Sequence, residues 1–141
     1  MFDVTPASAL TAYGCGAACL QMLLGYYGAD TDAEALYREC GVTERGCSAK
    51  ALLQAGRAHG LDMTAWRMDA EELLKQDRPA IIWWGRCHWV LFCGTATDGL
   101  VCLCDPDNPL MQVVPADEFN ELYSGVALFN GEPHDLEPDA E

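Results

Sequence analysis

Three residues, Cys15, His88 and Asp105, have the side chains that nucleophilic catalysis requires. Cys15 lies where a Gly-rich loop gives way to an apolar helical run. Backbone N–H groups at a helix N-terminus favour the thiolate, which is the reactive form of a cysteine. Such a nucleophile also needs a base, a group that orients the base, and a donor for the oxyanion. His88 and Asp105 can take the first two of these roles, and this chemistry needs no cofactor.

The runs at residues 87–94 and 100–106 are typical of two strands of a β-hairpin, with Asp98-Gly99 as the turn signal. If residues 95–98 form the loop, Gly94 pairs with Gly99, and His88 lies directly across from Asp105. The Cβ atoms of such neighbours are roughly 5 Å apart, which allows a hydrogen bond between imidazole and carboxylate. We therefore expect His88 and Asp105 to pair.

Each candidate also has an ordinary structural interpretation. Cys15 could be a buried small thiol, His88 a satisfied histidine at a strand end, and Asp105 a turn residue. Cys19, one helical turn after Cys15, is interpreted as a core residue, with a redox pair between the two as the alternative. A catalytic set explains Cys15, His88 and Asp105 together, whereas the structural interpretation needs three separate coincidences.

Composition and charge restrict the partners and the location. The chain has 141 residues, of which 50% are hydrophobic and 21% charged, as expected of one domain with a real core. Its net charge of -14 disfavours phosphate backbones, so we expect no nucleic-acid partner. Neither a secretory signal nor a membrane-spanning run is recognised, which favours the cytoplasm. Residues 1–130 are predicted to fold, with residues 131–141 as an acidic disordered tail or linker.

Eight cysteines are interpreted mainly as core thiols in a reducing compartment. Four of them project from one face of the predicted hairpin: Cys87, Cys93, Cys102 and Cys104. Zinc needs four ligands about 2.1 to 2.3 Å from one point, whereas same-face neighbours on strands are roughly 6 to 7 Å apart. No Cys-x-x-Cys pair occurs. We therefore predict no metal site.

Helix signals fill the first half of the chain, and strand signals fill most of the second. The expected helices are residues 16–28, a second capped by Thr31 and Glu34 and ending near Cys40, a third from Ser48 to His59, a fourth capped by Asp69 and Glu72, and a fifth at Pro115 to Tyr123. The expected strands are residues 62–67, 80–84, the hairpin, 111–114 and 126–129. This pattern predicts an α+β fold, with a buried central helix carrying the nucleophile and an antiparallel sheet covered by helices.

Four short motifs resemble those of one known family: Cys15-Gly16-Ala17-Ala18-Cys19-Leu20, Tyr26-Tyr27-Gly28, His88-Trp89-Val90-Leu91 and Asp105-Pro106. The family is the papain-like double-glycine leader peptidases, also called bacteriocin-processing peptidases. They are often found at the N-terminus of peptidase-containing ABC transporters. The resemblance covers residues 5–130 and implies a papain-like cysteine peptidase fold.

The resemblance implies an endopeptidase that removes leader peptides after Gly-Gly or Gly-Ala from ribosomally made precursors such as bacteriocins and lanthipeptides. Cys15 would attack, His88 would act as base and then as acid, and Asp105 would orient His88. Glycine selectivity is expected from a narrow slot beside the nucleophile. Trp83, Trp84 and Trp89 are candidate walls of this slot, although aromatic residues in strands are more often core.

The same resemblance implies a precursor peptide with an amphipathic leader helix as the partner. Apolar contacts would dominate its docking, because such leaders are frequently acidic and the chain carries -14. Transporter membrane and nucleotide-binding domains are further possible partners, which would place the domain at the cytoplasmic face of the membrane.

Two positions depart from the family pattern. The family has a glutamine six residues before the nucleophile, which donates to the oxyanion, but this chain has Ala9. The backbone N–H of Cys15 is then the remaining donor, and loss of one donor typically costs about 100- to 1000-fold in turnover. Gly14 replaces the acidic residue that usually precedes the nucleophile. The alternatives are therefore a weakened or inactive leader-binding domain and, from the cysteine count alone, a thiol redox or metal-binding protein.

Overall fold

The computed structural model describes residues 1–85, 88–96 and 98–133. Its helices are α1 Cys15–Tyr26, α2 Ala33–Glu39, α3 Ala49–Ala58, α4 Ala70–Leu74 and α5 Ala116–Leu122. Its strands are β1 Met63–Arg67, β2 Ala80–Trp84, β3 His88–Thr95, β4 Val101–Asp105, β5 Asn108–Val114 and β6 Tyr123–Asn130. The predicted order of helices and strands is confirmed.

Helix α1 is the buried centre of the helical half, as its apolar sequence predicts. Its buried residues are Cys15, Gly16, Ala17, Ala18, Cys19, Leu20, Met22, Leu23 and Leu24. Cys19 has no exposed surface, which agrees with its interpretation as a core residue. The helix ends at Tyr26, and Gly28 follows with a φ of 85°, a conformation that favours glycine.

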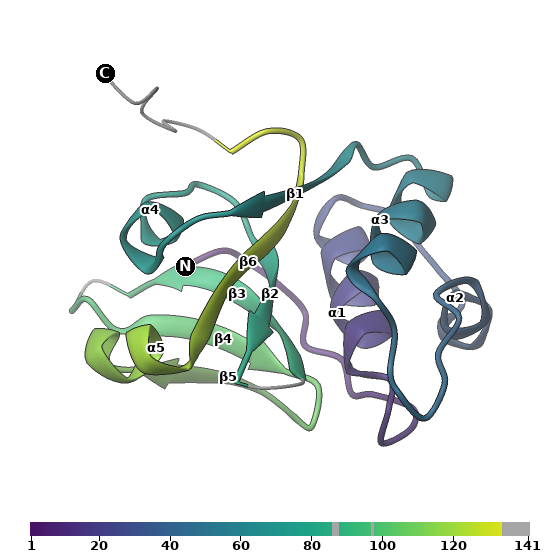
Figure 1. Cartoon of the computed structure of the whole chain (residues 1–141), viewed down its shortest axis with the longest axis horizontal. Coiled ribbons are helices and arrows are strands. Elements are labelled where there is room, and N and C mark those ends of the chain that lie inside the picture. The colour runs from purple at the N-terminus through teal and green to yellow at the C-terminus, as the bar shows by residue number, and fades with distance from the viewer. Residues whose placement is uncertain (86–87, 97, 134–141) are drawn as a thin grey trace.

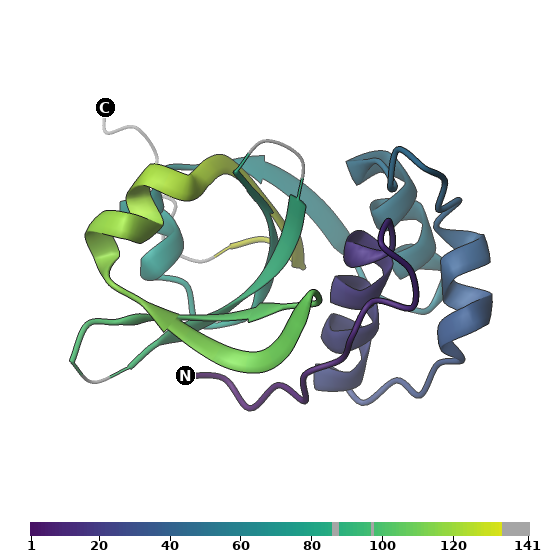
Figure 2. The same ribbon diagram turned by 90° about the horizontal axis from the view of Figure 1, so that it is seen from below.

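The strands form one sheet in the order β1-β6-β2-β3-β4-β5, and every neighbouring pair is antiparallel. Helices α1 and α3 pack on one face, and α2 packs on these two helices (Figure 1). Figure 2 shows the strongly curved strands, with α4 and α5 on the far side of the sheet from α1. Since side chains alternate along a strand, Ile81 and Leu91 join the core beneath α1, whereas Ile82 and Phe92 join a second core with Phe119 of α5.

Side-chain caps begin the short helices. Ser48 caps α3 and Asp69 caps α4, each accepting a hydrogen bond from a backbone N–H in the first turn at 3.1 and 2.9 Å. Both caps are as predicted. The predicted cap of α2 is wrong by one residue, because the carboxylate of Asp32, not the hydroxyl of Thr31, accepts from the first turn. The capping box between Thr31 and Glu34 is therefore replaced by a single Asp cap.

The hairpin of β3 and β4 has a different register from the predicted one. The expected turn pairs Leu91 with Cys102, whereas in the structure Leu91 pairs with Cys104. Strand β3 carries a β-bulge near its end, where Gly94 has a φ of 96°. The turn also extends further, because the N–H of Ala96 donates to the carbonyl of Leu100 at 2.8 Å. The bulge and the longer turn shift β4 by two residues relative to β3.

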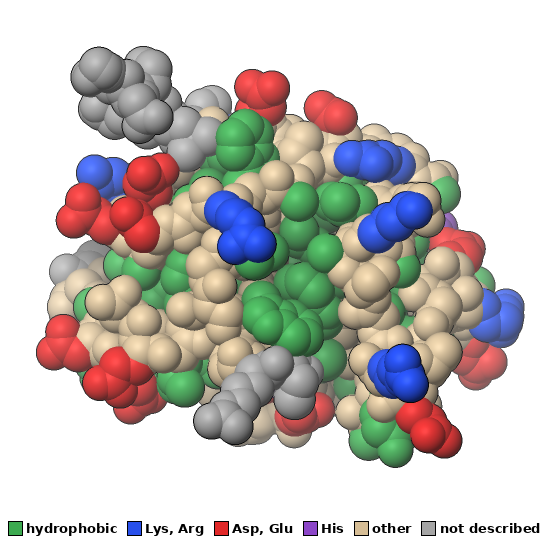
Figure 3. Space-filling view, viewed as in Figure 1, with side chains coloured by type: hydrophobic (Ala, Val, Ile, Leu, Met, Phe, Trp, Pro, Cys, Tyr) green, Lys and Arg blue, Asp and Glu red, His purple; other side chains and the backbone are tan. Residues whose placement is uncertain are grey.

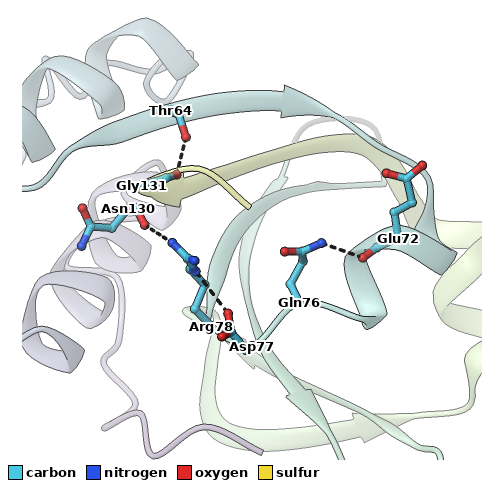
Figure 4. A network of polar contacts seen from close by, with 7 residues as sticks. All are labelled: Thr64, Glu72, Gln76, Asp77, Arg78, Asn130 and Gly131. Carbon is cyan, nitrogen blue, oxygen red and sulfur yellow. Dashed lines mark hydrogen bonds and ion pairs between the residues drawn. The ribbon is translucent and has the colours of Figure 1, made fainter. Parts of the chain in front are cut away.

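Polar contacts fix the end of β6 against β1 and the segment before β2 (Figure 4). Thr64 Oγ1 donates to the carbonyl of Gly131 at 2.6 Å, and Arg78 Nη1 donates to the carbonyl of Asn130 at 2.8 Å. These bonds supply partners for backbone carbonyls where the strand pairing ends. The C-terminal end of β6, near the last described residues, is thereby held in place.

Some predictions fall on residues outside the described part of the chain. Cys87 and residues 134–141 are among them. The other three hairpin cysteines, Cys93, Cys102 and Cys104, share the core beneath α1, as the same-face prediction expects. Within the described residues, none of the helices combines the length and the apolar character that crossing a bilayer requires.

We expect Ser48→Ala to lower the free energy of unfolding by about 1 kcal/mol, because it removes the side-chain cap of α3. Denaturant unfolding followed by circular dichroism measures this change. Ser8→Ala, at an exposed position of the N-terminal segment, is the matched control and should stay within about 0.5 kcal/mol of wild type. Equal effects of the two substitutions would contradict the capping role.

Candidate active site

The N-terminus of α1 brings Cys15 to the start of β3, where His88 lies. Cys15 is the first residue of the helix, and its side chain is buried, with 8% of the residue exposed. On one side, the Cys15 thiol lies close enough to the imidazole of His88 to raise its pKa. On the other side, His88 Nε2 lies 2.7 Å from Asp105 Oδ1. Because Nε2 is engaged by the carboxylate, Nδ1 is the nitrogen that remains for the thiol.

The predicted contact between His88 and Asp105 is therefore present, although not by direct cross-strand pairing. In the observed register, Asp105 of β4 lies across from the position two residues after His88 on β3. His88 and Asp105 are therefore diagonal neighbours. Diagonal neighbours lie on the same face of a sheet and remain within reach of longer side chains. Asp105 Oδ1 also accepts a hydrogen bond from the N–H of Asp107 at 2.9 Å, which fixes the carboxylate in the turn.

The surroundings of His88 favour its charged form. The hydrogen bond with Cys15 raises the pKa of His88 most, burial opposes it, and the hydrogen bond and charge of Asp105 raise it further, giving a pKa of about 9. The imidazole is then protonated at neutral pH. A protonated imidazole beside a cysteine can act as a proton donor.

Asp107 adds a second carboxylate that the sequence analysis missed. Its Oδ2 lies 3.8 Å from His88 Nε2, and 62% of its side chain is exposed. Among the described residues, His88, Asp105 and Asp107 are the group whose possible ligand atoms lie within 4.8 Å of one another. A metal ion bound there would displace the hydrogen bond between His88 Nε2 and Asp105, so the arrangement suits proton handling better than metal binding.

The segment before Cys15 is held between the sheet and α2. The N–H of Ala9 donates to the carbonyl of Pro106 at 3.2 Å, which places Ala9 beside the turn that carries Asp105. The N–H of Leu10 donates to the hydroxyl of Tyr37 at 2.5 Å. The position of the expected glutamine therefore lies at the site, but a methyl side chain offers no donor. Nothing in the structure explains why alanine stands there.

The second departure, Gly14, has a physical explanation. A Cβ atom on Gly14 would lie 2.2 Å from Tyr37 Cε2 and 2.4 Å from the Tyr37 hydroxyl. Tyr37 is itself buried, and this burial is the main cause that raises the pKa of its hydroxyl. The ring thus occupies the space that an acidic side chain at position 14 would need. The sequence carries no signal for this contact, because Tyr37 lies on another helix.

The three tryptophans have different surroundings. Trp89 is 4% exposed, stacks edge-on against Trp83 with ring centroids 4.6 Å apart, and donates from Nε1 to the carbonyl of Cys47 at 3.1 Å. Its ring also borders Gly16, where a Cβ atom would lie 2.9 Å from Trp89 Cδ1. Trp84 packs on α5 instead. Trp83 and Trp89 therefore lie on the side of the nucleophile helix, whereas Trp84 belongs to the opposite core.

Comparison with known proteins identifies related sequences and folds. A model described as the peptidase C39 family matches residues 7–134. A similar solved structure is a double glycine motif protease from an AMS/PCAT transporter in complex with the leader peptide, with a TM-score of 0.85, 31% identity and 91% of both chains covered. The peptidase domain of Streptococcus ComA, a bi-functional ABC transporter of a quorum sensing pathway, has a TM-score of 0.80 at 17% identity, covering 92% of this chain and 97% of that chain. The predicted papain-like α+β fold is confirmed.

Two curated relatives come from Escherichia coli. The colicin V secretion/processing ATP-binding protein CvaB is 27% identical over 114 residues, and the probable microcin-H47 secretion/processing ATP-binding protein MchF is 26% identical over 114 residues. Each match covers 81% of this chain and 16% of the relative. The chain thus spans a small part of the length of these relatives.

We expect Gly14→Asp to lower the free energy of unfolding by more than about 1 kcal/mol, because the new side chain collides with Tyr37. Denaturant unfolding measures the change. Gly25→Ala is the control, since a Cβ atom there meets nothing within 4 Å. The double variant Gly14→Asp/Tyr37→Ala should lose less stability than the sum of its single variants. Strict additivity would show that the two positions do not compete for space.

We expect the proton NMR signal of His88 to titrate with a pKa of about 9 in the wild type. The pKa should fall in Asp105→Asn and fall further in Cys15→Ala, because the hydrogen bond with Cys15 is the larger cause. A raised histidine pKa stabilises the fold fully below the ordinary value of 6.5, and this contribution is lost as the pH rises through about 9. A wild-type titration near 6.5 would contradict the effect of Cys15 and Asp105 on the pKa of His88.

Proposed function

This chain belongs to the peptidase C39 family, and we propose that it is a cysteine endopeptidase that cleaves precursor peptides after a Gly-Gly or Gly-Ala leader terminus. The observation that carries the proposal is that one imidazole, His88, lies 2.7 Å from Asp105 and interacts with Cys15 at the start of α1. A leader-binding function alone has no need for this chain of contacts. The proposed catalytic residues are therefore Cys15, His88 and Asp105.

In the proposed mechanism the Cys15 thiolate attacks the carbonyl carbon of the last leader residue, and the backbone N–H of Cys15 donates to the oxyanion. The His88 imidazolium then gives its proton to the leaving amine, which leaves a thioester on Cys15. Neutral His88 next takes a proton from water, whose oxygen attacks the thioester. The leader leaves as a carboxylate, and the thiolate and imidazolium are restored. Asp105 holds the ring through Nε2 during both steps.

The proposed substrate is a ribosomally made precursor of the bacteriocin or lanthipeptide type, with an amphipathic leader helix. Apolar contacts would carry its affinity, because the chain has a net charge of -14. On the face drawn in Figure 3, apolar side chains gather near the centre, over the junction of the sheet with α1 and α3, and basic side chains are scattered singly. That distribution supports apolar docking of a leader rather than steering by charge.

We further propose that the peptidase domain comprises residues 1–130 and that the following acidic segment is a linker or tail. The two Escherichia coli relatives, each a secretion/processing ATP-binding protein, support a role coupled to export. In that setting the domain would work at the cytoplasmic face of the membrane beside transporter membrane and nucleotide-binding domains. A chain that acts alone on exported precursors is equally consistent with the site.

A second candidate function, a domain that binds leader peptides with little or no cleavage, is favoured by one observation. Ala9 removes the side-chain donor from the oxyanion site while its backbone remains beside Pro106. The backbone N–H of Cys15 is then the donor that the proposal retains. Loss of a donor of this kind slows turnover by about 100- to 1000-fold without preventing attack.

We expect purified protein to cut a synthetic precursor peptide after its Gly-Gly leader terminus, as measured by mass spectrometry and timed product formation. Cys15→Ala should abolish cleavage. Ala9→Gln should raise kcat by up to about 100-fold with a small change in KM, because a donor to the oxyanion acts in the transition state.

A peptide with leucine in place of the second glycine is the matched substrate control and should not be cut. If the peptide binds but stays intact in both wild type and Ala9→Gln, the peptidase proposal fails and the leader-binding function replaces it. Cleavage that persists in Cys15→Ala would instead contradict the assignment of the nucleophile.

A further inference from the structure

A second pair of thiols lies next to the nucleophile helix and takes no part in the proposed peptidase mechanism. Cys40 caps the C-terminus of α2, and Cys47 precedes the Ser48 cap of α3. Both residues line the same surface pocket, and each shifts the pKa of the other thiol. They therefore bracket the loop between α2 and α3, which is itself pinned by an antiparallel bridge between Thr43 and Gly46.

The two sulfur atoms differ in exposure. Cys40 is 1% exposed, whereas Cys47 is partly exposed and lines a surface pocket together with Cys40, Thr43 and Trp83. A small molecule in this pocket can reach Cys47 before it reaches Cys40. The sulfur of Cys47 also packs on α1, because a Cβ atom on Gly16 would lie 2.5 Å from it.

The two thiols also differ in their electrostatic surroundings. The hydrogen bond from Cys40 is the largest cause that lowers the pKa of Cys47, and the backbone N–H of Ala17 in the first turn of α1 lowers it further against the effect of burial. The same hydrogen bond and burial raise the pKa of Cys40 well above its usual range. An accessible sulfur that favours the thiolate beside a buried thiol is the arrangement of an attacking and a resolving cysteine.

We propose that Cys40 and Cys47 form a redox-active dithiol that closes to an intramolecular disulfide on reaction with a low-molecular-weight disulfide such as oxidised glutathione. The proposal rests on the surface pocket that both cysteines line, on the partial exposure of Cys47 and on the burial of Cys40. It goes beyond the proposed peptidase function and does not depend on it.

The reaction balances over two exchange steps. The Cys47 thiolate attacks one sulfur of the small disulfide, forms a mixed disulfide and releases one thiolate, which takes the proton of Cys40. The Cys40 sulfur then attacks the sulfur of Cys47, forms the protein disulfide and releases the second small thiolate, which takes a proton from water. Two protein thiols are oxidised, and one small disulfide is reduced to two thiols.

The chain contains a natural control pair. The sulfurs of Cys93 and Cys104 lie 3.5 Å apart, and this hydrogen bond also raises the pKa of Cys93 and lowers that of Cys104. Both residues, however, have no exposed surface. If access decides the reaction, Cys93 and Cys104 should stay reduced under conditions that oxidise Cys40 and Cys47.

The test is incubation of the folded, reduced protein with oxidised glutathione, followed by alkylation of the remaining thiols and peptide mass mapping. A Cys15→Ala background prevents adducts at the nucleophile, and wild type is run beside it. We expect a linked peptide that joins Cys40 to Cys47, lighter by two hydrogens and reversed by dithiothreitol. In Cys40→Ser, where no thiol resolves the adduct, Cys47 should retain glutathione.

Cys47→Ser should give neither the link nor an adduct on Cys40. We expect Cys47 to react at least about tenfold faster than Cys93 or Cys104. Absence of the linked peptide in the folded wild type would overturn the proposal, as would equal oxidation of the buried control pair. These readouts need no cleavage assay, so their failure and failure of the peptidase function are distinguishable. The wild-type map remains decisive even if a serine variant does not fold.

Discussion

The contact between the Cys15 thiol and the His88 imidazole is the constraint on which the rest of the structure depends. It joins the first residue of α1 to the first residue of β3, and so it requires the helical half and the sheet to meet at one fixed point. The apolar surface of α1 supplies the packing that holds this junction, since the helix is buried from Cys15 to Leu24 apart from Gln21. A helix with one polar face could not place the thiol so deeply.

The segment that precedes Cys15 provides further hydrogen bonds that hold this junction in place. It bonds to the sheet through Pro106 and to α2 through Tyr37, within two adjacent residues, Ala9 and Leu10. The two departures from the family pattern then differ in kind. The ring of Tyr37 leaves no space for a side chain at position 14, so packing explains why glycine replaces the acidic residue there. Ala9 leaves the backbone path unchanged and removes a donor, so its consequence is chemical.

Much of the fold could be predicted because its signals are local. The sequence signals for these elements involve residues close together in the chain. They are the glycines that end helices, the caps at Ser48 and Asp69, and the apolar run of α1. The predicted hairpin register is wrong because it pairs Gly94 with Gly99, whereas the strand has a bulge near Gly94 and a longer turn. The predicted contact of His88 with Asp105 is present despite the wrong register, because a shift of two residues keeps each side chain on the same face of the sheet.

The parts of the site that the sequence did not reveal are contacts between distant elements. Tyr37 reaches Gly14 from α2, and Cys47 reaches Gly16 from the loop before α3. No spacing rule connects such positions, since their contact depends on how whole helices pack. A residue close to the site in sequence can also point away from it. Trp84 lies on the strand next to His88, but its ring packs in the opposite core against Phe119.

The most direct test of the central contact is the rate at which iodoacetamide alkylates Cys15 at pH 7, read by peptide mass mapping. His88→Ala is compared with His59→Ala, a histidine at the end of α3 that bonds Glu39 instead. Because the thiolate is the reactive form, the account predicts that His88→Ala slows alkylation of Cys15 at least about tenfold, while His59→Ala leaves it unchanged. Equal rates in wild type and His88→Ala would contradict the account, since His88 would then not support the thiolate.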